Sequence, residues 1–79
     1  MEYPIYIPQI SNHLTGCKLI EWRKEVGDTV LKGEPLLISE TQKASINLES
    51  PETGTLIGIF VRSGEWAEVT APVGILQIE

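Results

Sequence analysis

Three side chains in this sequence have the chemistry for catalysis, metal binding or modification: the imidazole of His13, the thiol of Cys17 and the amine of Lys43. A catalytic base or metal ligand at His13 would need partners. No second histidine or cysteine stands at ligand spacing, and Cys17 alone makes a poor metal site. We therefore expect His13 to be a polar loop residue and predict neither a metal site nor catalytic residues.

Lys43 is distinguished by its position. It lies at the centre of ISETQKASINLESPETG, positions 38 to 54, between two runs that are typical of strands. This placement predicts a hairpin with Thr41, Gln42, Lys43 and Ala44 at its tip. The stretch TQKA lacks the Asn-Gly or Asp-Gly of a tight primed turn, so we expect a type I turn or a slightly longer loop. On composition alone, Lys43 would be an ordinary solvated lysine.

The elements that would position this lysine are predicted to be strands. Apolar residues alternate from Tyr3 to Ile7, and short Val, Ile and Leu runs recur near residues 19–22, 36–38, 46–48, 56–61 and 73–78. Such patterns are typical of strands, and no segment has the apolar spacing of a surface helix. Turn residues separate the runs, at Ser11-Asn12, Gly27-Asp28, 33–35, 50–54, Ser63-Gly64 and Ala71-Pro72. The chain is therefore predicted to be all-β, a sandwich or small barrel.

An ungapped offset of 37 (54 minus 17) aligns residues 17–42 with residues 54–79. The identical pairs are Leu19 with Leu56, Ile20 with Ile57, Gly27 with Gly64, Pro35 with Pro72 and Ile38 with Ile75. We interpret this as an internal duplication within one domain, residues 1–79, with quasi-two-fold symmetry and about four strands from each half. Neither half could bury its apolar face alone, so the halves must pack together. Lys43 would map just past the chain end, which predicts that lysine and C-terminus lie at opposite ends of the domain.

Composition and charge exclude several classes of partner. Eleven acidic and six basic residues give a net charge of -5, and the basic residues are scattered. Nucleic acids and anionic membranes both require a dense positive patch, so neither is expected to bind. A single cysteine permits no internal disulfide and favours a reducing compartment. With no signal peptide and no apolar run of ~20 residues, we expect a soluble chain, and the end at residues 77–79 without a Pro/Ala-rich linker favours an excised domain.

The sequence resembles the biotinyl/lipoyl attachment domain family, specifically the lipoyl domains of acyltransferase components of 2-oxoacid dehydrogenase complexes. The resemblance covers essentially the whole chain, through IPQI, LIEWRKEVGDTVLKGEPLLISETQKAS, ESPETGTL, VRSGE and APVGILQI. Gly33 lies ten residues before Lys43 and Gly54 eleven after it, which matches the family's placement of turn glycines.

The resemblance implies a flattened β-barrel of two four-stranded antiparallel sheets, with lipoate joined by an amide to the amine of Lys43. It implies a monomeric carrier that is not itself an enzyme, within a dihydrolipoamide acyltransferase of the bacterial cytoplasm or mitochondrial matrix. The implied partners are a lipoate ligase or lipoyl transferase, a thiamine-diphosphate dehydrogenase, the acyltransferase core and a flavoprotein dihydrolipoamide dehydrogenase.

Some positions depart from the family pattern. Gln42 stands where the family usually has Asp, which bears on partner recognition and on modification of the lysine. Cys17 and Thr70 stand where turn glycines are common in the family, so both are expected in turns, with a modest change of the turn at Cys17. The loop of residues 9–16 is expected beside the Lys43 hairpin, where it would help partners to distinguish this carrier.

Other residues are expected to be structural. Trp22 is predicted to lie in the core and Trp66 to be a partly exposed packing residue. We expect Glu40, Glu49 and Glu52 to be solvated surface residues, with docking of a basic partner as the alternative.

Two other functions compete with the lipoyl carrier. A biotinyl carrier would move carboxyl groups, but that family usually flanks its lysine with methionines, whereas Gln42 and Ala44 stand here and the only methionine is Met1. An unmodified assembly module, such as the lipoyl-like segment of a membrane-fusion adaptor, usually lacks the hairpin lysine.

Overall fold

The computed structural model describes residues 1–9 and 13–78, and this part of the chain forms eight strands. Their bounds are β1 (Glu2–Ile5), β2 (Gly16–Trp22), β3 (Thr29–Val30), β4 (Pro35–Glu40), β5 (Ser45–Glu49), β6 (Gly54–Ile59), β7 (Trp66–Glu68) and β8 (Gly74–Gln77). They form two four-stranded sheets with the orders β1-β8-β6-β3 and β5-β4-β2-β7. The pairs are antiparallel, which confirms the predicted fold.

The described residues contain no helix, so none of them could cross a membrane in a helical span. The expected turn at Ser11-Asn12 and the last residue of the second aligned segment, Glu79, lie outside the described residues.

The core lies between the two sheets because alternate side chains of each strand face inward. In β2, Cys17 and Leu19 are buried whereas Lys18 and Ile20 are exposed. The buried apolar residues form one cluster: Ile5, Ile7, Cys17, Leu19, Val30, Leu36, Leu37, Ile46, Leu56, Ala67, Val73, Leu76 and Ile78. Both sheets contribute to this cluster, so each sheet covers the apolar face of the other.

Residues that the offset of 37 aligns make equivalent hydrogen bonds. Gly27 N–H donates to the Leu56 carbonyl, and Gly64 N–H donates to the Leu19 carbonyl, both at 2.7 Å. Gly27 and Gly64 have φ values of 101° and 90°, a region that favours glycine at both turns. We propose an internal duplication as the origin of this symmetry.

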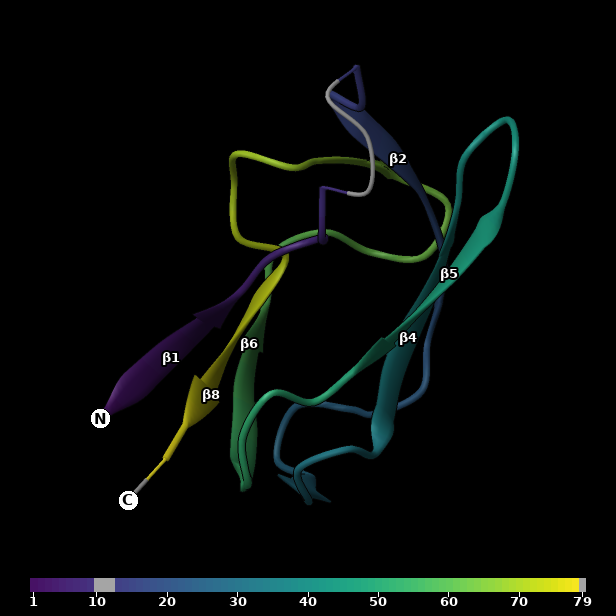
Figure 1. Cartoon of the computed structure of the whole chain (residues 1–79). Coiled ribbons are helices and arrows are strands. Elements are labelled where there is room, and N and C mark those ends of the chain that lie inside the picture. Colours follow the sequence, from purple (N-terminus) through teal and green to yellow (C-terminus); the bar gives the residue numbers. More distant parts are fainter. Residues whose placement is uncertain (10–12, 79) are drawn as a thin grey trace.

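The termini and the Lys43 hairpin lie at opposite ends of the molecule, as predicted (Figure 1). Met1 and Ile78 exchange two hydrogen bonds at 2.8 Å, from each residue's nitrogen to the other's carbonyl oxygen. The molecule is elongated, with extents of 35 × 21 × 20 Å.

Predictions for two residues were wrong. Cys17 lies inside β2 and is 1% exposed, so its position is not a turn. Its small apolar side chain enters the core opposite Ala67, and φ is positive at none of the described non-glycine residues. Trp22 is half-buried at the end of β2, where it packs against the core cluster rather than within it. A buried indole N–H needs an acceptor, and this one donates to the Val61 carbonyl at 2.7 Å. Thr70 does lie in a turn.

Candidate functional site

The hairpin between β4 and β5 is closed by Thr41. The strands remain paired up to Glu40 and Ser45, and Thr41 N–H then donates to the Ala44 carbonyl at 2.8 Å. The Thr41 hydroxyl oxygen accepts the N–H groups of Lys43 at 3.3 Å and Ala44 at 3.1 Å. This side chain therefore fixes the backbone of the tip, as short polar side chains do in turns.

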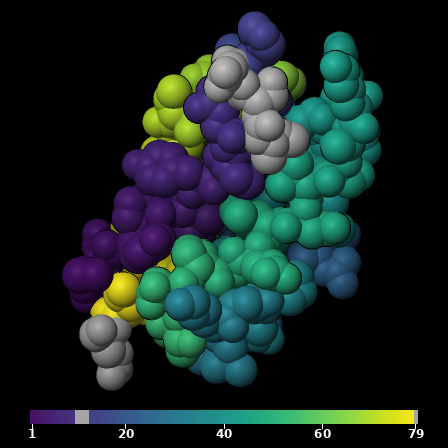
Figure 2. Space-filling view, viewed as in Figure 1, coloured from purple at the N-terminus to yellow at the C-terminus, as the bar shows by residue number. Residues whose placement is uncertain are grey.

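The tip itself consists of Gln42 and Lys43. Because no described non-glycine residue has a positive φ, the turn is not of a primed type, as the stretch TQKA predicts. Figure 2 shows the hairpin projecting from the body of the molecule. The hydrogen bonds of Thr41 thus hold a turn that lacks the glycine of tight primed hairpins.

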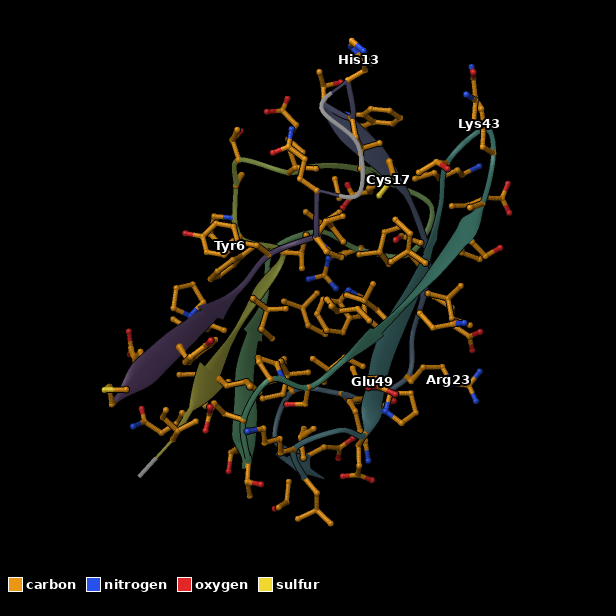
Figure 3. The ribbon with its side chains drawn as sticks, viewed as in Figure 1. Tyr6, His13, Cys17, Arg23, Lys43 and Glu49 are labelled. Carbon is orange, nitrogen blue, oxygen red and sulfur yellow. The ribbon has the colours of Figure 1, made fainter. Side chains whose placement is uncertain are left out.

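The side chain of Lys43 is exposed while its backbone is held. Figure 3 shows Lys43 on the hairpin, at the end of the molecule farthest from the termini. Within residues 1–9 and 13–78, the ion pairs are Arg23 with Glu21 and Lys24 with Glu34, so the Lys43 amine is in none. An amine in this position is accessible to a modifying enzyme.

The hairpin forms one wall of an open groove of about 810 Å³. Its residues are 13–18, 40–44 and Trp66. The described end of the loop of residues 9–16 thus lies beside the hairpin, as expected, whereas residues 10–12 lie outside the described residues. His13 is an exposed residue of this groove.

Trp66 is the large aromatic residue of the groove and is 60% exposed, in agreement with the prediction for it. It is paired with Lys18 across β7 and β2, and Lys18 is paired with Glu40 across β2 and β4. Its indole covers Gly16, where a Cβ atom would come within 2.6 Å of the indole nitrogen. Glycine at this position therefore allows the ring to lie close to the strand.

Glu40 and Glu49 are exposed as expected, and Glu52 is half-buried. Glu40 lies at the base of the hairpin tip, whereas Glu49 pairs with Pro35 at the other end of β4 and β5. The perturbed carboxylate belongs to a different turn: the pKa of Glu34 lies below its ordinary value of 4.5. The Leu31 N–H donates to this carboxylate at 2.6 Å and the Lys24 ammonium at 3.3 Å. The described residues include no group of three or more potential metal ligands.

The sequence predicted the hairpin residues and the neighbouring loop of residues 9–16, but not the place of Trp66 in the groove. Trp66 is far from Lys43 in sequence, and the pairing of β7 with β2 and of β2 with β4 brings it to the same end of the sheet as the hairpin. The three-residue strand β7 is too short to show an alternating pattern. Only the sheet order places these residues together.

Comparisons with known proteins bear on this geometry. A family model described as "Biotin-requiring enzyme" matches residues 4–76. The chain is 36% identical, over 91% of its length, to the dihydrolipoyllysine-residue acetyltransferase component 4 of the chloroplastic pyruvate dehydrogenase complex of Arabidopsis thaliana. It spans 15% of that protein.

Two solved structures share the fold. The lipoyl domain of the 2-oxoglutarate dehydrogenase complex from Azotobacter vinelandii matches with a TM-score of 0.78 and 20% identity, over 95% of both chains. Urea carboxylase from Kluyveromyces lactis matches with a TM-score of 0.77 and 21% identity, over 98% of this chain and 6% of that enzyme. At these identities the likeness concerns the fold.

Proposed function

This chain belongs to the biotinyl/lipoyl attachment family, and from that premise we propose that it is a lipoyl carrier domain with lipoate joined by an amide to Nζ of Lys43. Membership implies a covalently attached lipoyl or biotinyl group. The observation that carries the proposal is the exposed Lys43 amine on a hairpin that Thr41 holds in place. Within the described residues, no carboxylate pairs with this amine, so attachment breaks no ion pair.

Lipoate is favoured over biotin by the residues next to the lysine. Gln42 and Ala44 occupy the positions where biotinyl carriers usually have methionine. The relative from Arabidopsis thaliana is named for its dihydrolipoyllysine residue, which supports the same choice. The fold alone does not distinguish a lipoyl from a biotinyl carrier, because urea carboxylase contains the same fold.

When bound, lipoate supplies a dithiolane that accepts an acyl group and two electrons. The protein's own contribution is to position the attachment point. Two paired strands and the Thr41 hydrogen bonds keep the Lys43 backbone fixed, so that motion is confined to the side chain and its attached group. Tethering of this kind replaces diffusion between active sites with a high effective concentration.

We propose that the domain serves the acyltransferase component of a 2-oxoacid dehydrogenase complex. Its partners would be a lipoate ligase or lipoyl transferase, a thiamine-diphosphate dehydrogenase, the acyltransferase core and a flavoprotein dihydrolipoamide dehydrogenase. A reducing compartment, the bacterial cytoplasm or the mitochondrial matrix, suits the free thiol of Cys17. The name of the relative from Arabidopsis thaliana supports the choice of complex, and the exposed amine of Lys43 supports attachment of lipoate by a ligase or transferase.

Intact mass measurement tests the proposal. The chain is incubated with lipoate, ATP and a lipoate ligase, and we expect one lipoyl increment. Lys43→Arg should remove the increment, and the matched Lys18→Arg, an exposed lysine of β2, should keep it. A biotinyl increment in cells that contain both ligases would favour the carboxyl carrier. No increment with either ligase would favour an unmodified assembly module.

A further inference from the structure

We propose that Trp66 is a resting site, within the groove beside the hairpin, for the dithiolane ring of the lipoyl group on Lys43. The inference rests on the proposed function. It assigns a binding role to a side chain on a different strand pair from the attachment site.

Packing against the protein covers only part of the Trp66 side chain. Trp22, the other tryptophan, packs against the core and donates its indole N–H to Val61. Trp66 is 60% exposed, and its indole N–H has no acceptor among the residues that the structure describes. It lies on the outer face of its sheet, where Gly16 leaves room beneath the ring. Part of the exposed surface of Trp66 lines the groove beside the hairpin, and another part lines a hollow beside residues 68–70.

The attachment point lies within reach of this ring. The pairs Trp66–Lys18 and Lys18–Glu40 place Trp66 two strands from the base of the hairpin, about 10 Å at ~4.8 Å per strand. Lys43 is three residues beyond Glu40, which adds up to about 10 Å along the hairpin at ~3.3 Å per residue. The two Cα atoms are therefore roughly 14 Å apart by this geometry.

The attached arm is long enough to cover that distance. Eleven bonds separate the Lys43 Cα from the dithiolane ring, and an extended chain of that length spans about 13 Å at ~1.2 Å per bond. The indole of Trp66 extends toward the groove and shortens the remaining distance. The arm is tethered on the rim of the groove, so among possible occupants it has the highest effective concentration.

The chemistry of the two groups is complementary. Sulfur makes favourable contacts with aromatic rings, and amide formation removes the charge of Lys43, so the arm is neutral and largely apolar. Its methylenes can lie along Leu14 and Ala44, which also line the groove. Ordering the rotatable bonds of the arm costs about as much free energy as the contact between sulfur and ring gains. The dithiolane ring therefore occupies the site on the order of half of the time. A carrier needs such a weak site, because the arm must leave it to enter an active site.

The experiment compares unloaded and lipoylated ¹⁵N-labelled chain, with loading verified by intact mass. The sequence has two tryptophans, so the spectrum has two indole N–H signals, and Trp66→Phe assigns them. Loading should shift the Trp66 signal and leave the Trp22 signal in place. In a second measurement, Trp66→Ala should speed reduction of the dithiolane by a soluble phosphine about twofold, because half occupancy shields half of the rings. The control is Phe60→Ala, an aromatic that is 56% exposed and lies outside the groove.

The outcomes separate this inference from the proposed function. A complete lipoyl increment with an unmoved Trp66 signal and equal reduction rates overturns the resting site and leaves the carrier function intact. No increment on the unsubstituted chain overturns both. A shift confined to Trp66, together with faster reduction in Trp66→Ala alone, supports the inference.

Discussion

Replacing Ser39 by alanine is expected to stabilise the protein. Ser39 lies in β4 and is fully buried, and its hydroxyl has no hydrogen-bond partner among the described residues. A buried hydroxyl without a partner costs about 1–3 kcal/mol of folding free energy. The residue that the offset of 37 places at the equivalent position is Leu76, which is also fully buried, so an apolar side chain suits this environment.

The magnitude follows from two opposing contributions. Removing the oxygen relieves at least about 1 kcal/mol of the desolvation cost. The void left behind, about 15 Å³, costs about 0.4 kcal/mol at ~24 cal/mol per Å³. We expect a net stabilisation near 1 kcal/mol, which for a domain of this size raises Tm by about 6 °C.

Urea and thermal unfolding measure the effect, with Ser50→Ala as the matched control. Ser50 is 3% exposed, but its hydroxyl donates to the Glu52 carbonyl at 2.6 Å. Its loss should destabilise the fold by about 1 kcal/mol, so the two serine substitutions should have opposite signs. If Ser39→Ala lowers Tm as Ser50→Ala does, the Ser39 hydroxyl has a partner and the reasoning is refuted.

Three further predictions concern the turns and the groove. Thr41→Val should speed amide hydrogen exchange at the tip of the hairpin about fivefold, because a bond of about 1 kcal/mol is lost, and Thr41→Ser should restore the parent rate. Gly16→Ala should destabilise the domain by about 1–3 kcal/mol, since the new methyl group overlaps a backbone carbonyl and an indole ring, and tryptophan emission should shift as that ring moves. Glu34 has a pKa lowered by the Leu31 N–H and by Lys24, so its stabilisation is complete above pH 4.5 and is lost as the pH falls through the folded-state pKa. Urea titrations from pH 6 to 3 should therefore show a smaller loss of stability in Glu34→Gln than in the parent, and equal losses would contradict the assignment.

The apolar pattern and the turn residues predicted an all-β sandwich or small barrel, whereas the two four-stranded sheets were implied by the family resemblance. Alternating apolar residues identified the long strands, and Gly27 and Gly64 marked equivalent turns that do require a positive φ. The short strands β3 and β7 were missed because two or three residues carry no periodicity. Their positions are set by pairing with β6 and β2, which is a tertiary effect.

The site could be predicted only in part for the same reason. Lys43 and its neighbours are contiguous, so their spacing between two strand patterns placed them at a tip. The hydroxyl of Thr41 acts through backbone groups, a role that its residue type permits but that no motif announced. The error at Cys17 came from carrying a turn from the family pattern onto a residue that alternation places in the core.

The charge distribution around the hairpin limits how partners can recognise the loaded domain. Once Lys43 is amidated, the tip of residues 41–44 carries no formal charge, because Gln42 stands where the family usually has Asp. The net charge becomes -6 (-5 minus one), but the acidic side chain nearest the tip is Glu40, at the base of the hairpin. Electrostatic steering therefore brings a basic partner to the body of the domain rather than to the arm, and it weakens with salt. Restoring the charge with Gln42→Asp should raise the association rate with such a partner at low salt and leave the rate at high salt unchanged. An equal gain in rate at both salt concentrations would contradict steering and would mean that residue 42 acts by direct contact with the partner.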